Sequence, residues 1–452
     1  MLLALALASM GDWVPARWNS SDPQTLDLAA KSAINCLLVE KANWSAAFNE
    51  QAARRGIAVL GVVRPGDELK ELPQRLAGAK FSGAVIEGAS GETAVLRAAM
   101  QDSRLALIEM EPRTRMRFDS GASVLATNQG VWPGINAMDD GKAKAAPSGA
   151  PWIDTNTGFL RFVRSITRSG IWIGNQPPMG KVYPIARYLQ VQGEAAMVGA
   201  RWVIALDADF EKRLLAREDA ALAAWSLLGE QIAFTESRPE WRKLDPYGNF
   251  ALVQDVDSGG LISGGILDMI TVKHTPVRPI PARKLEPKAM EGAQLAVNVD
   301  PSALNDRQKE TLRGFTRGGG TLLTAPPGWR FPPQREDQIT LDESEIEKLD
   351  AIWKEVNSLT GRRNLGVRLF NVSSMLSNVV APESGKPVVL HLVNYSDYPV
   401  ENVTAHVLGK FSKATLYEPG AAQGKKLNLY ESEDGTGIDL DKVTAIATLV
   451  LE

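Results

Sequence analysis

Polar side chains recur through the first half of the chain, each just after a short apolar run, and several of them could do chemistry together. They are Arg17 and Asn19, Glu40, Arg64, Glu87, Glu109 and Glu111, Asn128 and Gln129, Asn175 and Gln176, and Asp207 and Asp209. Paired carboxylates supply general acids, general bases and nucleophiles, while amides and arginines bind hydroxyl groups. Brought together, such a set suits a neutral, hydroxyl-rich ligand. Held apart, the same residues are solvated loop starts and helix caps.

The apolar runs before these residues have the length and spacing of strands. They cover residues 13–18, 34–39, 57–63, 81–86, 105–110, 124–126, 171–173 and 202–206. Segments between them repeat apolar residues at three- and four-residue steps, as amphipathic helices do, for example at 43–55, 67–77, 92–101 and 184–198. This alternation predicts an α/β fold, a (β/α)8 TIM barrel over residues 12–245. Because a barrel collects the carboxyl ends of its strands on one face, we expect the polar residues around one mouth.

A long segment interrupts the second half of the predicted barrel. Residues 130–151 are rich in Gly, Ala, Pro and Lys, with Trp132 near their start and Trp152, Asp154 and Asn156 just after them. Long loops are uncommon in compact domains and often functional, so we expect this one to cover the mouth. Tryptophan faces beside carboxylates and amides suit sugar rings. Packing in the core is the competing interpretation for each tryptophan.

Composition narrows the class of function. The 452 residues are too many for one core, and 44% hydrophobic with 23% charged residues is typical of globular domains. A net charge of −3, without a basic cluster, argues against a nucleic-acid partner. The single cysteine, Cys36, excludes an intrachain disulfide, and the three histidines lie outside the barrel, which disfavours a zinc site or a Ser-His-Asp triad there. We expect no cofactor and no metal, with a carboxylate-only Ca2+ site left open.

The amino terminus has features of a targeting segment. Residues 1–11 resemble the apolar part and cleavage end of a secretory signal, although no basic residue precedes them. They predict a secreted or periplasmic protein, with a cytoplasmic one as the alternative. The apolar run is too short to cross a bilayer, and no later run reaches eighteen residues, so no membrane span is expected.

Two more domains are predicted after the barrel. Residues 246–335 read as an open α/β domain, with strands at 250–253, 277–280, 294–299 and 321–325 and helices at 260–271 and 305–317. Residues 336–365 form a linker with one helix near 343–358. From 366 to 452 short alternating runs separated by turn residues predict a small β-sandwich, with strands at 367–370, 388–393, 400–407, 413–417 and 445–451.

A family resemblance lies in these later segments. Residues 295–323, LAVNVDPSALNDRQKETLRGFTRGGGTLL, resemble the amidotransferase-like (flavodoxin-like) domain that follows the barrel in bacterial β-galactosidases and related glycoside hydrolases. VVLHLVNYS at 388–396 and KATLYEP at 413–419 look like their terminal sandwich. The resemblance covers nearly the whole chain and implies a glycoside hydrolase acting on an oligo- or polysaccharide. The middle domain has His274 but no cysteine, so it is expected to be a scaffold or a homo-oligomer contact rather than an amidotransferase.

The catalytic residues follow the family pattern only in part. Those hydrolases place an Asn-Glu pair after strand four and a glutamate after strand seven. Here Glu87 ends the fourth run without a preceding Asn, and the seventh run ends at Asn175 and Gln176. The resemblance carries Glu87 over as the general acid and leaves its partner open. Glu111 and Asp154 are the first candidates, followed by Glu109 and Asp207, and Glu109 and Glu111 should share one strand face.

The remaining candidates would bind the substrate. They are Arg17, Glu40, Glu109, Asn128, Trp132, Trp152, Asn156, Asn175 and Asp207. For each carboxylate singly, an ion pair with Arg17, Arg64, Arg113 or Arg161 competes with catalysis. A barrel that binds carbohydrate without cleaving it, or a structural barrel, is the alternative function. Two facing carboxyl groups, about 5 Å apart for retention or roughly 6.5–9.5 Å for inversion, would favour the hydrolase.

Overall fold

The computed structural model describes most of the chain. The described residues are 9–64, 71–88, 92–101, 103, 105–118, 121–133, 155–255, 275–326, 329, 343–372 and 375–452. The chain divides into two compact units, which we describe separately. The barrel unit comprises residues 1–130, 168–188 and 200–237, and the C-terminal unit comprises 131–167, 189–199 and 238–452. Among the described residues, no helix is long and apolar enough to cross a membrane.

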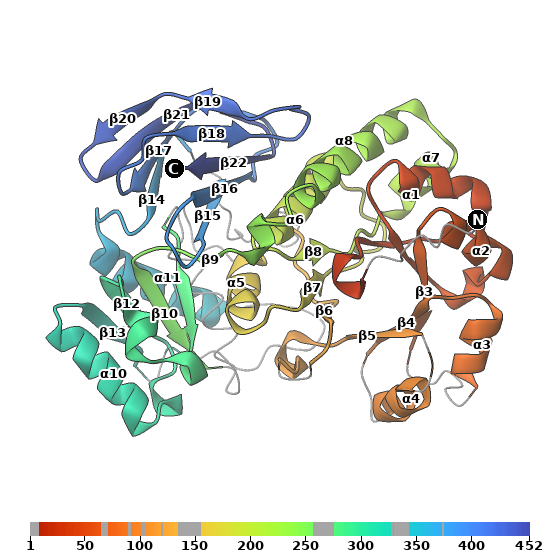
Figure 1. Cartoon of the computed structure of the whole chain (residues 1–452), viewed down its shortest axis with the longest axis horizontal. Coiled ribbons are helices and arrows are strands. Elements are labelled where there is room, and N and C mark those ends of the chain that lie inside the picture. Colours follow the sequence, from red (N-terminus) through yellow and green to blue (C-terminus); the bar gives the residue numbers. More distant parts are fainter. Residues whose placement is uncertain are drawn as a thin grey trace. The chain divides into compact units, whose positions relative to one another are not determined.

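Eight parallel strands form the barrel in chain order, which confirms the predicted fold (Figure 1). They are β1 (Pro15–Arg17), β2 (Cys36–Val39), β3 (Ala58–Val63), β4 (Gly83–Glu87), β5 (Ala106–Met110), β6 (Val124–Thr127), β7 (Gly170–Ile173) and β8 (Arg201–Trp202). The sheet closes where the Arg17 amide donates to the Ile204 carbonyl at 2.7 Å. The seam between β5 and β6 is thin, because Met110 opposite Ala126 is the one residue pair that joins these two described strands.

Helices accompany the strands. They are α1 (Leu26–Ala30), α2 (Ala46–Arg54), α3 (Leu72–Gly78), α4 (Glu92–Gln101), α7 (Ala208–Leu215) and α8 (Asp219–Glu236) in the barrel unit, α5 (Thr157–Ile166) in the C-terminal unit, and α6 (Ile185–Ala196), which spans the division. Of these, α2, α3, α4 and α6 lie within or close to the predicted segments 43–55, 67–77, 92–101 and 184–198, and the others were not predicted. Ser45 caps α2 by accepting the Phe48 amide, as helix-start chemistry requires.

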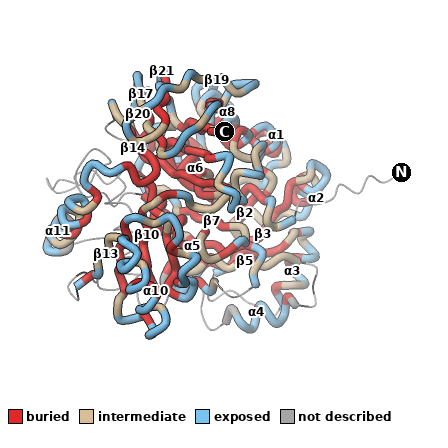
Figure 2. Tube along the Cα trace, turned by 60° about the vertical axis from the view of Figure 1, so that its left-hand side comes forward, coloured by how far each residue is buried: buried red, intermediate tan, exposed pale blue. Residues whose placement is uncertain are grey.

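The barrel interior is a packed apolar core built from alternate residues of each strand. Cys36 and Leu38 of β2, Val62 of β3, Val85 of β4 and Met110 of β5 belong to one buried cluster. Figure 2 shows β2 and β3 as largely buried. Burial raises the pKa of the Cys36 thiol, which behaves as a small hydrophobe here. Because side chains alternate along a strand, the residue two positions beyond the last inward core residue also faces the axis.

The C-terminal unit contains a second parallel sheet. Its strands lie in the order β11 (Arg278–Pro281), β10 (Phe250–Gln254), β12 (Leu295–Asn298) and β13 (Thr321–Thr324). The helix α10 (Asp306–Arg317) begins with a capping box in which Asn305 and Gln308 bond each other's backbone amides. The helix α11 (Glu343–Thr360) also forms as expected. The predicted helix at 260–271 and His274 lie outside the described residues, and the amidotransferase-like assignment and the three domain boundaries stay predictions.

Two antiparallel sheets complete the C-terminal unit and confirm the predicted sandwich. One is ordered β14 (Val367–Phe370), β17 (Val400–Leu408), β21 (Gly435–Val443) and β20 (Leu429–Ser432). The other is ordered β19 (Lys425–Leu427), β18 (Ala414–Tyr417), β22 (Ile446–Leu451), β16 (Val388–Asn394), β15 (Met375–Ala381) and β9 (Asp245–Pro246). Their facing side chains form one aliphatic core, which includes Leu369, Leu390, Val403, Ile438 and Leu449. The sequence patterns did not predict β9, β15, β19, β20 or β21.

Candidate functional site

Four charged side chains meet at the carboxyl ends of neighbouring barrel strands, and we call Arg17, Glu40, Arg64 and Glu87 the mouth cluster. Arg17 donates from Nη2 to Oε1 of Glu87 in a short contact, and from Nη1 to Oε1 of Glu40 at 3.4 Å. Arg64 donates from Nη2 to Oε2 of Glu87 at 3.0 Å and to Oε1 of Glu40 at 2.8 Å. Each arginine therefore bridges both carboxylates.

Strand alternation places the mouth cluster. Glu40 follows Leu38 by two residues, and Arg64 follows Val62 by two, so both continue the inward row of their strands. Glu87 continues the inward row of β4 in the same way from Val85. The cluster therefore forms the layer of side chains directly above the apolar core, at the strand ends where barrel enzymes hold their substrates.

Burial is uneven across the mouth cluster. The side chains of Glu87 and Arg17 are 8% and 11% exposed, whereas those of Glu40 and Arg64 are 27% and 47% exposed. The hydrogen bonds from Arg64 hold the pKa of the Glu40 carboxyl below its usual range, even though partial burial opposes this effect. Glu40 is therefore an ionised carboxylate at neutral pH.

The two carboxylates of the mouth cluster lie close together. Oε1 of Glu40 and Oε2 of Glu87 are each within 3.0 Å of the same Nη2 atom of Arg64, so they are at most about 6 Å apart. A retaining glycosidase needs a separation of about 5–5.5 Å. The upper bound is compatible with that separation, while the arginines occupy the oxygens that would carry out the chemistry.

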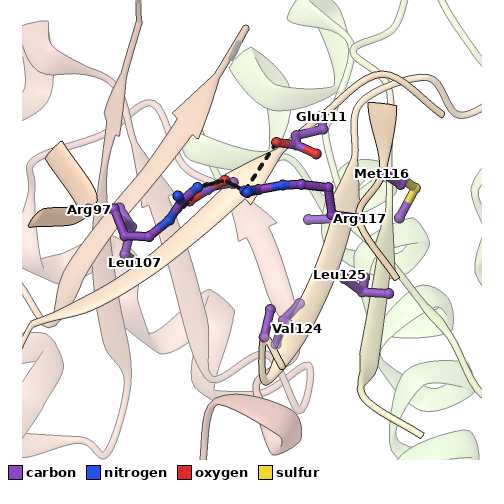
Figure 3. A pocket seen from close by; sticks show the side chains of 10 residues that line it. Arg97, Leu107, Glu111, Met116, Arg117, Val124 and Leu125 are labelled. Carbon is purple, nitrogen blue, oxygen red and sulfur yellow. Dashed lines mark hydrogen bonds and ion pairs between the residues drawn. The ribbon is translucent and has the colours of Figure 1, made fainter. Parts of the chain in front are cut away.

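Glu109 and Glu111 line a different pocket, at the β5–β6 seam (Figure 3). This cavity measures about 220 Å3, and none of the mouth cluster contributes to its lining. Glu109 accepts hydrogen bonds from Arg97 of α4, the shortest at 2.6 Å, and from Arg117 at 2.9 Å. Both glutamates have the opposite parity to the inward residues of β5, so the structure does not bring them together with Glu87.

Glu111 is the less neutralised carboxylate of the seam pocket. Its nearest arginine nitrogen, on Arg117, lies 3.7 Å away, as the dashed line in Figure 3 marks. Burial raises the pKa of the Glu111 carboxyl, and Arg117 only partly offsets this effect.

Replacing Glu111 by glutamine is expected to raise the melting temperature slightly at pH 7–8, on the order of 1–2 °C. Since the pKa is raised in the folded state, ionisation of Glu111 costs the folded protein stability above that pKa. The gain should therefore shrink as the pH falls toward about 4, where folded and unfolded chains are both protonated. Thermal unfolding of both proteins between pH 4 and 8 measures it. Glu109→Gln is the matched control and should lower the melting temperature, because it breaks two arginine contacts. If the gain for Glu111→Gln stays constant with pH, the raised pKa of Glu111 is not its cause.

Two other predicted residues of the barrel unit, Asp207 and Asn175, form hydrogen bonds with backbone groups. Asp207 caps α7 by accepting the Phe210 amide at 2.9 Å, and its second oxygen accepts the Tyr188 hydroxyl at 2.8 Å. Asn175 donates to the Gly130 carbonyl at 2.9 Å. Asn128 follows Ala126 by two residues and so continues the inward row of β6, half-buried. Their roles in substrate binding stay predictions.

Two further candidates belong to the C-terminal unit. Trp132 is 5% exposed, and Asn156 is 1% exposed and donates to the Val131 carbonyl at 2.9 Å. Asn156 also donates to Oε2 of Glu194 at 3.0 Å. Trp152 and Asp154 lie outside the described residues, so their predicted roles are untested.

Sequence reasoning missed Glu194. It is fully buried on α6 and accepts the Thr157 amide at 3.1 Å, at the start of α5. The available signal was a glutamate beside the apolar side of the predicted helix, three residues after Val191 and next to Ala195. A charged residue at such a position is rarely buried unless it is paired.

Comparison with solved structures finds a similar fold in two glycosidases. An α-L-fucosidase isoenzyme 2 from Paenibacillus thiaminolyticus superposes with a TM-score of 0.60 at 10% identity, covering 97% of this chain and 99% of that one. A β-galactosidase from Rahnella sp. R3 superposes with a TM-score of 0.52 at 9% identity, covering 96% and 99%. At these identities the likeness is one of fold. No family model and no curated protein matches the sequence.

Proposed function

We propose that this protein is a glycosidase that binds an oligo- or polysaccharide at the mouth of its barrel, with Glu87 as the central catalytic carboxylate. The observation that carries the proposal is the placement of Glu87 and Glu40 above the barrel core, at most about 6 Å apart. The fold shared with two glycosidases supports the same class of reaction. Carboxylates and guanidinium groups together provide acceptors and donors for sugar hydroxyls.

Within this proposal the two carboxylates have different roles. Glu40, ionised beside Arg64, suits the nucleophile or the group that stabilises positive charge on the sugar. Glu87 is proposed as the proton donor to the leaving group. It can reach a glycosidic oxygen only when substrate hydroxyls take over its contacts with Arg17 and Arg64. Asp154, which lies outside the described residues, remains the other proposed partner, whereas Glu111 lines the separate seam pocket.

One observation favours the non-catalytic alternative. Both oxygens of Glu87 accept hydrogen bonds from arginines, and the mouth cluster balances two carboxylates with two guanidinium groups. A site that is already neutral and fully bonded can recognise hydroxyl groups without transferring a proton. A carbohydrate-binding barrel is therefore the second candidate function.

Hydrolysis and binding should be measured side by side on the wild type and three variants. The substrates are an aryl α-L-fucoside, an aryl β-D-galactoside and a panel of plant and bacterial polysaccharides, with binding followed by calorimetry. We expect wild-type turnover, and a fall in kcat of about 10²–10⁴-fold in Glu87→Gln while binding survives. Glu40→Gln should also lose turnover, whereas Glu109→Gln, outside the mouth, should keep it.

The outcomes separate the two candidate functions. Saccharide binding by wild type without any turnover would establish the binding barrel and exclude the hydrolase. Equal losses in Glu87→Gln and Glu109→Gln would show that the effect is structural and would remove Glu87 from the mechanism. If the wild type shows no binding and no turnover with any substrate of the panel, both candidate functions are overturned.

A further inference from the structure

The solvent face of the β14–β17–β21–β20 sheet gathers aromatic and polar side chains in two rows across its strands. We call this set the aromatic face: Arg368, Phe370, Thr404, His406, Asp439 and Tyr430. Arg368 lies opposite His406, which lies opposite Gly437, which lies opposite Tyr430. Phe370 lies opposite Thr404, and Thr404 opposite Asp439. Three strand spacings give the face a width of about 14 Å.

Its aromatic rings adjoin one another. The ring centroids of Phe370 and His406 are 4.7 Å apart, and those of His406 and Tyr430 are 6.0 Å apart. The guanidinium of Arg368 lies 5.1 Å from the centre of the Phe370 ring. The alternate residues of the same strands, such as Leu369 and Ile438, point into the sandwich core. The rings therefore belong to the solvent side of the sheet and are not needed to fill the core.

The ring of Tyr430 lies over Gly437, its partner on β21. A Cβ atom at Gly437 would be 2.1 Å from the Tyr430 ring, so only glycine permits this close approach. The residue is nevertheless 41% exposed. One side of the Tyr430 ring has a structural role, because it covers a glycine within a strand. The other side is left as a flat aromatic surface open to solvent.

Hydrogen-bonding atoms surround this ring. Oδ1 of Asp439 accepts from Thr404 at 2.7 Å and from the Tyr430 hydroxyl at 3.3 Å. Neither Oδ2 of Asp439 nor Nδ1 of His406 makes a hydrogen bond within the described part of the chain. An acceptor and a ring nitrogen are thus available beside the exposed face of Tyr430.

The balance of charges on the aromatic face argues against a polyanionic ligand. Arg368 is paired with Asp434 at 3.3 Å, and Asp439 adds a second carboxylate, so the surface has no excess of positive charge for a polyanion. An exposed aromatic plane flanked by acceptors and donors matches a sugar ring, which presents a C–H face and peripheral hydroxyls. We propose that the aromatic face is a second, non-catalytic binding site for a neutral saccharide chain, centred on Tyr430. This site does not depend on the chemistry proposed for the barrel.

Affinity gel electrophoresis of the full chain tests the site, with β-1,4-galactan or fucosylated xyloglucan cast in the gel. Tyr430→Ala is expected to weaken retardation by about tenfold in apparent Kd. His406→Ala should weaken it less, and Tyr430→Phe, which keeps the ring, should bind nearly as wild type does. Tyr398→Ala is the matched control, because Tyr398 is 64% exposed and lies off the aromatic face.

Each result decides the proposal. Loss of retardation in Tyr430→Ala, while Tyr430→Phe and Tyr398→Ala are retarded as the wild type is, supports it. Wild-type mobility unaffected by either polysaccharide overturns it, as does equal weakening in Tyr398→Ala and Tyr430→Ala. Because retardation is read without turnover, a barrel that proves inactive does not affect the test.

Discussion

Replacing Glu194 by alanine is expected to lower the free energy of unfolding of the C-terminal unit by about 3–5 kcal/mol. The carboxylate is fully buried and bonds the backbone amides of Asn156 and Thr157 and the Asn156 side chain. The first turn of α5 has no side-chain cap of its own, so Glu194 satisfies the amides that the helix leaves open. Its removal leaves those buried donors without an acceptor.

Hydrogen exchange measures the loss of stability in Glu194→Ala separately for each unit. A separate measurement is needed because a chain with two units need not unfold in one step. Amides of α5 should exchange much faster in Glu194→Ala, while peptides from β2 and β3 should keep their protection. Glu230→Ala is the control, since Glu230 is exposed on α8, and a change within about 0.5 kcal/mol is expected there. Unchanged protection of α5 in Glu194→Ala would refute the capping role.

Replacing Arg17 by methionine is the second large effect and should cost about 3 kcal/mol of stability in the barrel unit. Arg17 is 11% exposed and contacts Glu87, which is 8% exposed, so its loss strands a carboxylate in a poorly solvated layer. Arg64 still contacts Glu87, which keeps the cost toward the lower end of the usual range. Urea unfolding followed by barrel tryptophan fluorescence measures it.

Two further variants separate the ion pair from simple packing. Arg64→Met should cost only up to about 1 kcal/mol, because the Arg64 side chain is 47% exposed and its ion pairs are screened. The double variant Arg17→Met/Glu87→Met should recover most of the loss, since it removes the buried charge along with its partner. Strictly additive losses in the double variant would show that Arg17 acts through its own packing instead.

The sequence predicted the local elements well because each is encoded within a short window. Runs such as 57–63 and 105–110 became β3 and β5, and Asn305 with Gln308 marked the start of α10. The strand ends were also identifiable, so Glu40, Arg64 and Glu87 could be expected at the barrel mouth. The strands β9, β15, β19, β20 and β21 were missed, because a sheet accepts short segments and residues with weak alternation when neighbouring strands supply the hydrogen bonds and the packing.

By itself, then, the sequence determined which segments form strands and helices and which polar residues follow them. Only the tertiary structure decided which side of each strand those residues occupy and what they meet there. Glu87 pairs with Arg17, 70 residues away, and Glu194 meets Asn156, 38 residues away. Successive side chains of a strand point to opposite faces. Glu87 therefore continues the inward row of β4 and lies at the mouth, whereas Glu109 and Glu111 have the opposite parity on β5 and line the seam pocket. Such contacts form between residues that are distant in the sequence, when the barrel closes and its elements pack. A pattern within a short window of the sequence therefore does not predict them.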